Sequence, residues 1–267
     1  MKRVLIFAAY SRNGTVCEDV QDLLRAFRPF ADKILFVADN EFSETELQKL
    51  KKTADWVQCS HHGEYDFGSY KRGLAAAKEK GWLDGAEELI FCNDSCFGPC
   101  FPLQEMFAKM DKTDCDFWGI VESREIQPHV QSYFWAFREK LFASDLFKNF
   151  MDGIEKLSSP REIISKYEVP ATAFFRKNGF TVKTYIDWDG SLPPTACPVT
   201  LLQKRCPLIK RKVFQRTKYA KESVLKTLAL IKKTNPKLYF QIKKTYGIKL
   251  YVLLLKRGAA RLFSCKK

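Results

Sequence analysis

Residues 88–99, ELIFCNDSCFGP, constrain the fold of this chain more than any other stretch. Apolar residues 89–92 stop at three small polar residues, and a Gly-Pro turn follows. This pattern is typical of a buried strand in a parallel sheet, and ligands bind beyond the carboxyl ends of such strands. A carboxylate there can hold a hard cation that in turn binds a diphosphate, although Asp94 could instead only cap the next helix. The polar residues are Asn93, Asp94 and Ser95.

Strands alternating with helices over the first 120 residues predict βαβ units and a parallel sheet. Beyond residue 122 the pattern is more aromatic and predicts a strand or extended segment followed by two long helices, the second of which begins or kinks near Pro170. The expected strands cover residues 3–9, 33–38, 56–59, 89–92, 117–121 and 131–137, and the expected helices cover 17–27, 69–80, 103–110, 141–157 and 163–178, with one more starting at Ser43.

The composition fits a globular protein with a substantial core, because 46% of the 267 residues are hydrophobic. The first apolar run is short and passes directly into a turn, so it is not expected to be a secretory signal. We therefore expect most of the nine cysteines to be reduced thiols in a cytosolic protein.

Charge divides the chain into two predicted domains, residues 1–203 and 204–267. The first holds 25 Lys or Arg and 30 acids, whereas the second holds 20 Lys or Arg and a single acid, Glu222. Basic amphipathic helices are expected at 218–232 and 236–244, and the last apolar run is too short to cross a bilayer. The extension therefore predicts a polyanionic partner, either an anionic membrane surface or nucleic acid, unless it is only a solvated basic helix.

Several enzyme classes are disfavoured by missing motifs. The sequence has no P-loop, no dinucleotide-binding GxGxxG after the first strand, and no GxSxG elbow. It also lacks any CxxC pair, so a zinc site is not expected. The remaining candidates are polar residues at the ends of strands.

One candidate segment, residues 63–74, lies between a predicted strand and a predicted helix. We expect Gly68 and Ser69 to begin the helix, where free N–H groups favour an anion. Asp66 could accept a hydrogen bond from a base or a sugar hydroxyl, and Lys71 and Arg72 could offset diphosphate charge. The alternative is an ordinary helix start with surface charges.

A second candidate is Glu168, which precedes an amphipathic helix ending at Asn178 and Gly179. It is either a general base presented at a helix start or a plain stabiliser of the helix dipole.

Several long motifs, in order, resemble the rhamnan synthesis F family, whose members are rhamnosyltransferases of polysaccharide assembly with a GT-A-like fold. The resemblance covers residues 3–214. The motifs are YDFGSYKRGL at 65–74, NDSCFGP at 93–99, DFWGI at 116–120, HVQSYF at 129–134 and PVTLLQKRCPLIKRKVF at 198–214.

This resemblance implies a GT-A-like α/β fold, with a mostly parallel sheet flanked by helices and a basic helical C-terminal extension. Asn93, Asp94 and Ser95 occupy the place of the Asp-x-Asp motif that binds a divalent ion, Mg or Mn, and the sugar diphosphate. This chain offers one carboxylate there instead of two, so Asp94 is the expected metal ligand. Glu168 resembles the acid that deprotonates the acceptor hydroxyl in inverting enzymes.

The expected function is transfer of a sugar, with rhamnose from thymidine-diphosphate rhamnose as the family's usual donor, to a polysaccharide or lipid-linked acceptor. The basic extension would hold the enzyme at the cytoplasmic face of a membrane. A non-catalytic protein that binds nucleic acid or glycan is the alternative. Further expected contacts are Asp116 near the donor, Trp118 as a cleft wall, and His129, Gln131 and Tyr133 for the acceptor or sugar.

Overall fold

A computed structural model of the protein describes residues 1–190, 192–215 and 221–247. The chain forms two compact units. The sheet unit comprises residues 1–94 and 103–189, and the basic unit comprises residues 95–102 and 190–267. The boundary that charge suggested, between residues 203 and 204, stays a prediction about domains.

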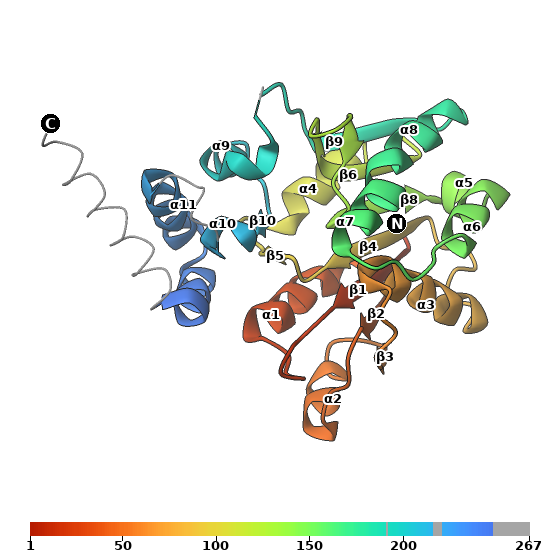
Figure 1. Cartoon of the computed structure of the whole chain (residues 1–267), viewed down its shortest axis with the longest axis horizontal. Coiled ribbons are helices and arrows are strands. Elements are labelled where there is room, and N and C mark those ends of the chain that lie inside the picture. The colour runs from red at the N-terminus through yellow and green to blue at the C-terminus, as the bar shows by residue number, and fades with distance from the viewer. Residues whose placement is uncertain (191, 216–220, 248–267) are drawn as a thin grey trace, which may run out of the picture. The chain divides into compact units, whose positions relative to one another are not determined.

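The sheet unit contains one mixed sheet with the strand order β3-β2-β1-β4-β8-β6-β7, and β9 pairs with β6 (Figure 1). The strands are β1 (Arg3–Ala9), β2 (Lys33–Ala38), β3 (Trp56–Cys59), β4 (Glu88–Asn93), β6 (Phe117–Ser123), β7 (His129–Val130), β8 (Phe134–Arg138) and β9 (Val182–Ile186).

Most of this sheet is parallel. Strand β1 pairs in parallel with β2 and β4, β2 pairs in parallel with β3, and β9 pairs in parallel with β6. Strand β8 is antiparallel to both β4 and β6, so β6 runs in the same direction as β4. The fold class predicted from the sequence, an α/β fold with a mostly parallel sheet flanked by helices, is confirmed.

Helices cover both faces of the sheet. Phe67 of α3 packs edge-on against Trp135, whereas Phe27 of α1 stacks on Phe134, with ring centroids 6.1 Å apart. Adjacent residues of a strand point to opposite faces, so α3 and α1 cover opposite sides of β8 and its neighbours. The helices of this unit are α1 (Glu18–Phe27), η1 (Arg28–Phe30), α2 (Glu44–Leu50), α3 (Tyr65–Glu79), α4 (Leu103–Met110), α5 (Glu139–Phe142), α6 (Asp145–Asp152), α7 (Pro160–Ile163), η2 (Ile164–Glu168) and α8 (Val169–Lys177).

The prediction that α3 starts at Ser69 was wrong, because the helix starts four residues earlier, at Tyr65. The N–H of Gly68 already donates to the carbonyl of Glu64, at 3.2 Å. Gly68 and Ser69 therefore lie within the helix, and neither offers a free helix-start N–H group to an anion.

Two expected long helices are divided. The Ser144 hydroxyl accepts the N–H of Phe147 and starts a new helix, so residues 141–157 form α5, α6 and a loop. The second helix contains a π-helical turn, η2, in which Val169 N–H bonds to the carbonyl of Ile164. Pro170, which has no N–H to donate, follows this wider turn.

In the basic unit, the short strands β5 and β10 form a two-stranded antiparallel sheet. Part of the expected helix at 218–232 is confirmed as α11, and residues 236–247 are helical. Residues 218–220 and 248–255 lie outside the described residues. The elements are β5 (Cys96–Phe97), η3 (Pro194–Ala196), α9 (Pro198–Gln203), β10 (Ile209–Lys210), α10 (Lys212–Gln215) and α11 (Lys221–Thr234).

Neither disulfides nor membrane-spanning helices occur in the part of the chain that the structure describes. All eight cysteines of the described ranges are free thiols. No helix among these residues is long and apolar enough to cross a bilayer.

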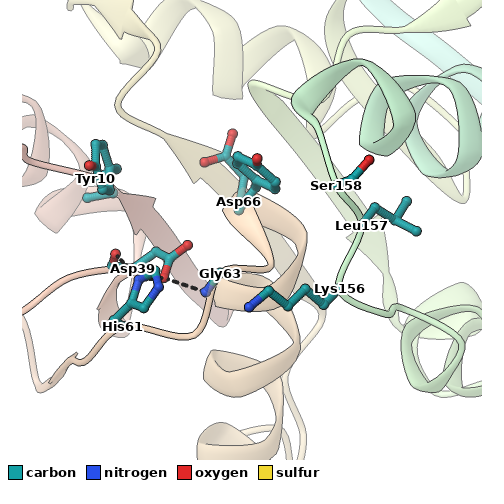
Figure 2. A pocket seen from close by; sticks show the side chains of 10 residues that line it. Tyr10, Asp39, His61, Gly63, Asp66, Lys156, Leu157 and Ser158 are labelled. Atoms are coloured by element: carbon teal, nitrogen blue, oxygen red, sulfur yellow. Dashed lines mark hydrogen bonds and ion pairs between the residues drawn. The ribbon is translucent and has the colours of Figure 1, made fainter.

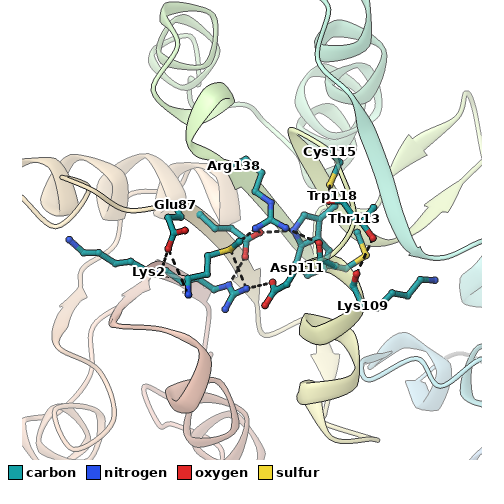
Figure 3. A network of polar contacts seen from close by, with 12 residues as sticks. Lys2, Glu87, Lys109, Asp111, Thr113, Cys115, Trp118 and Arg138 are labelled. Atoms are coloured by element: carbon teal, nitrogen blue, oxygen red, sulfur yellow. Dashed lines mark hydrogen bonds and ion pairs between the residues drawn. The ribbon is translucent and has the colours of Figure 1, made fainter.

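A buried charged network joins the first strand to the edge of the sheet where β4 and β6 begin (Figure 3). Glu88, fully buried, accepts from Arg3 Nε and Trp118 Nε1, each at 2.7 Å, and forms an ion pair with Arg138 Nη1 at 3.0 Å. Arg3 also pairs with Asp111. Because the donors share one carboxylate, removing it leaves the Arg138 guanidinium without the carboxylate it pairs with and Arg3 with Asp111 alone.

We predict that Glu88→Ala lowers the free energy of unfolding by about 3–5 kcal/mol, the usual cost of breaking a buried ion pair. The matched control is Glu87→Ala, which removes the neighbouring, largely exposed carboxylate beside the N-terminus and should cost under about 1 kcal/mol. Urea denaturation of both variants measures the difference. Equal costs would contradict the role assigned to Glu88.

Candidate functional site

The carboxyl ends of four parallel strands meet at one edge of the sheet. The register places Ala9 beside Ala38, Ala38 beside Cys59, and Ala8 beside Asn93. Neighbouring strands lie about 4.8 Å apart, so side chains just beyond these strands are close enough to share a ligand.

A cavity of about 460 Å³ opens at this edge, on the side of β1, β2 and β3 (Figure 2). Its walls come from the ends of these strands, the start of α3 and the loop after α6. The lining residues are Ala9, Tyr10, Asp39, His61, Gly63, Tyr65, Asp66, Lys156, Leu157 and Ser158.

Asp39 anchors one wall of this cavity. Its Oδ1 accepts the backbone N–H groups of His62, at 2.7 Å, and Gly63, at 2.8 Å, and His61 Nδ1 lies 3.1 Å away. Partial burial raises the pKa of Asp39, but the two backbone hydrogen bonds outweigh burial and hold that pKa below its usual value. The carboxylate is therefore ionised at neutral pH and fixes the loop that leads into α3.

His62 supports this wall through two hydrogen bonds made by its ring. Its Nδ1 accepts the N–H of Glu64, so the ring proton is on Nε2, which donates to the Ser69 hydroxyl at 3.0 Å. Burial lowers the pKa of His62, which favours this neutral ring. Tyr65, which lines the cavity, has a φ of +57°, a strained conformation of the kind that clusters at functional sites.

Lys156 is the cation of the cavity. It extends from the loop after α6 toward Gly63, and a Cβ added at Gly63 would lie 2.9 Å from Lys156 Cε (Figure 2). Two contacts hold the loop, since Lys71 Nζ donates to the carbonyls of Asp152 and Ile154 at 2.9 Å.

Asp66, a cavity residue predicted from the sequence, contacts the end of β4. Its Oδ2 accepts from Asn93 Nδ2 at 2.8 Å. Tyr70 lies beneath this pair, and burial, followed by the charge of Asp66, raises the pKa of its hydroxyl well above the usual value. The Tyr70 hydroxyl donates to the carbonyl of Ser132 at 3.3 Å. The structure therefore brings Asp66 and Asn93 together, as expected for residues at one strand end.

Asp94 directly follows β4 and contacts the cavity wall. Its Oδ2 accepts the backbone N–H of Tyr10 at 3.0 Å, and its own N–H continues the ladder to the carbonyl of Ala8. Asp94 is thus beside a lining residue, although it does not line the cavity itself.

Glu168 lies at the same edge of the sheet, next to the residues that precede β8. Its Oε1 accepts the N–H of Ser132 at 2.9 Å, and His129 Nε2 is 4.0 Å from the same oxygen. Strand β8 adjoins β4, so the strand order places this contact one strand from Asp94. That the two acids face one ligand stays a prediction.

Other residues expected to contact the donor have partners elsewhere. Arg72 pairs with Glu64 at 2.8 Å, and Lys71 holds the loop after α6. Ser95 belongs to the basic unit, where its hydroxyl accepts from Lys210 Nζ at 3.0 Å.

Two expected residues lie toward the opposite edge of the sheet. The carboxyl end of β6 is at the edge with the cavity, and Asp116 precedes the opposite, amino end of this strand. The Oδ2 of Asp116 accepts the N–H and the hydroxyl of Thr181. Trp118 is fully buried and donates to Glu88. These placements give both residues structural partners, and the expected roles of Asp116 near the donor and Trp118 as a cleft wall stay predictions.

His129 and Gln131 lie beside the carboxyl end of β6, because His129 pairs with Ser123 and Gln131 N–H donates to the carbonyl of Val121. Tyr133 is buried, and its carbonyl accepts the N–H of Asn93. All three residues thus lie at the edge of the sheet that carries the cavity, which we call the functional edge, and their contact with an acceptor stays a prediction.

Sequence reasoning missed Tyr10, Asp39 and Lys156. Asp39 had a usable signal, since it follows the apolar strand β2 just as Asp94 follows β4. Lys156 had none, because the loop that carries it was expected to be helical.

The residues at this edge could hold a divalent cation only if a bound substrate supplied some of its ligands. No group of three His, Cys, Asp or Glu side chains that could hold a metal occurs in the described ranges. A hard cation such as Mg²⁺ can, however, be held by one or two carboxylates together with substrate phosphates. Asp94 is the carboxylate that the sequence predicted for that role, with phosphate oxygens supplying the other ligands, and this assignment stays a prediction.

Comparison with known sequences identifies relatives. The family described as "Rhamnan synthesis protein F" matches residues 34–244, which confirms the resemblance seen in the motifs. Virulence protein VirA of Vibrio anguillarum is 26% identical over 180 residues, which are 67% of this chain and 57% of VirA. The uncharacterised protein y4gN of Sinorhizobium fredii is 22% identical over 155 residues, covering 57% of this chain and 40% of y4gN. The chain thus spans about half the length of these relatives or less.

Solved structures are more distant. A nucleoside-diphosphate-sugar pyrophosphorylase from Vibrio cholerae has a TM-score of 0.43 and 12% identity, covering 68% of this chain and 90% of its own. TarS of S. aureus in complex with UDP has a TM-score of 0.38 and 12% identity, with coverages of 54% and 48%. Likeness at this level leaves the function of the chain open.

We predict that Asp39→Ala lowers the free energy of unfolding by about 1–3 kcal/mol at pH 7, because two backbone N–H groups lose their acceptor. The pKa of Asp39 is lowered in the folded protein, so its contribution is present above the unfolded pKa of about 4 and is lost as pH falls through the folded value. The gap between wild type and variant should therefore shrink below about pH 4.

Urea denaturation between pH 7 and pH 3 measures this gap. Glu41→Ala, which removes an exposed carboxylate of a nearby loop, is the control and should change little. A gap that stays constant with pH would show that the charge of Asp39 is not what holds the loop.

Proposed function

Since the chain belongs to the rhamnan synthesis protein F family, we propose that it is a glycosyltransferase that moves a sugar from a nucleoside-diphosphate donor to an acceptor hydroxyl. The observation that carries this proposal is the order of groups along one sheet edge. The cavity at β1, β2 and β3 is followed by Asp94 at β4 and by Glu168 beside β8. An elongated donor fits such a row.

The nucleoside part of the donor would occupy the cavity. Asp39 and Asp66 supply acceptors for base or ribose donors, and Tyr10 and Tyr65 supply aromatic surface. The diphosphate would lie toward Asp94, with a divalent cation shared between that carboxylate and the phosphates. Lys156 offsets the anionic charge, a role that the sequence analysis gave to Lys71 and Arg72.

Glu168 would be the general base. One of its oxygens is fixed by the N–H of Ser132, and no described residue bonds to the other oxygen, Oε2. A carboxylate held in one orientation with one oxygen available suits removal of the proton from an acceptor hydroxyl. Attack from the face opposite the leaving diphosphate would invert the sugar carbon.

Within this proposal, the donor is thymidine-diphosphate rhamnose and the acceptor is a glycan or a lipid-linked glycan. Support comes from the family description alone.

The first experiment measures release of nucleoside diphosphate from thymidine-, uridine- and guanosine-diphosphate sugars without acceptor. We expect slow hydrolysis of thymidine-diphosphate rhamnose.

Glu168→Gln should retain donor binding and lower transfer to an acceptor by about 100-fold or more. Lys156→Ala should weaken donor binding severalfold, whereas Lys148→Ala, on the exposed side of α6, should not. No binding of any donor, by calorimetry, would refute the proposal.

The basic unit would hold the enzyme on an anionic membrane surface. Phe240 is 62% exposed and Leu225 is 43% exposed, on helical segments that also carry Lys232 and Lys243, and such a mixture suits a lipid interface. Each Lys or Arg near an anionic surface contributes about 1 kcal/mol.

We predict that the full chain sediments with phosphatidylglycerol vesicles at low salt and is released at high salt, because the attraction is screened. Phosphatidylcholine vesicles are the control and should not bind it. Equal binding to both vesicles would contradict an electrostatic contact, and salt-sensitive binding to RNA but not to vesicles would favour the nucleic-acid alternative.

A further inference from the structure

Residues 127–132 are fixed to the start of α8 by a set of hydrogen bonds. Gln127 Nε2 donates to the carbonyl of Val169 at 2.9 Å, and Val130 N–H donates to the Thr172 hydroxyl at 2.8 Å. Together with the bond from Ser132 to Glu168, these contacts hold the two segments in one arrangement. Side chains on them are therefore preorganised for a ligand.

The ring of His129 has a defined proton position when it is neutral. Its Nδ1 is 2.8 Å from the carbonyl oxygen of Gln127, and a carbonyl only accepts, so Nδ1 carries the hydrogen. Nε2 then presents a lone pair 4.0 Å from Glu168 Oε1, which is also an acceptor. Two acceptors thus face each other with no donor between them.

A third acceptor lies in the same segment. Gln131 is 6% exposed, and its Oε1 is buried without a hydrogen-bond partner among the described residues. In an extended segment, residues two apart such as His129 and Gln131 point to the same face. A buried acceptor without a partner has lost its hydrogen bond to water, so a ligand that donates to it restores that contact.

We propose that His129, Gln131 and Glu168 form an acceptor subsite that recognises hydroxyl donors and rejects anionic sugars. The proposal rests on the glycosyltransferase function and specifies the acceptor class. With His129 in its neutral form, each of the three side chains presents an acceptor atom, so a sugar hydroxyl satisfies it, whereas a carboxylate or phosphate would face these acceptors without a proton to give.

In the reaction, the bound hydroxyl gives its proton to Glu168 as its oxygen bonds to the sugar carbon. The bond from that carbon to the diphosphate breaks, and the nucleoside diphosphate leaves with the electron pair. Protons and charge balance without any further reactant.

The test compares two probes that differ in one group, methyl β-D-glucopyranoside and methyl β-D-glucuronoside, by saturation-transfer NMR on the full chain. We expect the neutral probe to bind at least tenfold more tightly.

His129→Asn and His129→Phe should weaken binding of the neutral probe, with thermal denaturation confirming that each variant folds. Glu168→Gln, which replaces an acceptor by a donor, should bring the ratio close to one.

The control is Glu125→Gln, which removes an exposed carboxylate from the neighbouring loop and should leave the ratio unchanged. Equal binding of both probes to the wild type, binding of neither, or an unchanged ratio in Glu168→Gln would overturn the proposal. Because this readout needs no donor, failure of the glycosyltransferase proposal shows separately, as absence of donor binding and cleavage.

Discussion

Parallel pairing of β1 with β2 and β4 is the constraint on which the functional edge depends. It brings strand ends that are far apart in the sequence to one line, with Ala9 beside Ala38 and Ala8 beside Asn93. Helices on both faces leave this line of strand ends as the place where loops gather. The cavity, Asp94 and Glu168 all belong to that edge, and each would be isolated if a strand were reversed.

Three carboxylates along the edge are held in the same manner. Backbone N–H groups donate to one oxygen of each, from His62 and Gly63 to Asp39, from Tyr10 to Asp94, and from Ser132 to Glu168. A hydrogen bond from a backbone amide stabilises the ionised form and fixes its orientation. The chain thus holds each of these carboxylates at a defined point of the edge.

Sequence reasoning predicted those parts of the structure that local patterns encode. Strands β1, β2 and β3 and helix α4 have the bounds expected from apolar runs, and Ser43 accepts the N–H of Glu46 as a capping box predicts. The start of α3 could not be predicted, because it depends on Asp39, which lies 26 residues earlier and holds the preceding loop. Contacts between distant segments leave no local signal.

The same limit applies to the site. Asp66, Asn93 and Asp94 were selected from the sequence as polar residues near the ends of strands, and all three lie at the functional edge. Lys71 and Arg72 had the right charge, but their direction on α3 is set by partners that the sequence does not reveal, the loop after α6 and Glu64.

The most direct measurement is a crystal structure of the full chain with thymidine diphosphate and magnesium. If the row of groups at the sheet edge is the donor site, the base occupies the cavity lined by Asp39 and the diphosphate lies beside Asp94. A nucleotide bound away from this edge, with the cavity containing only water, would contradict the account.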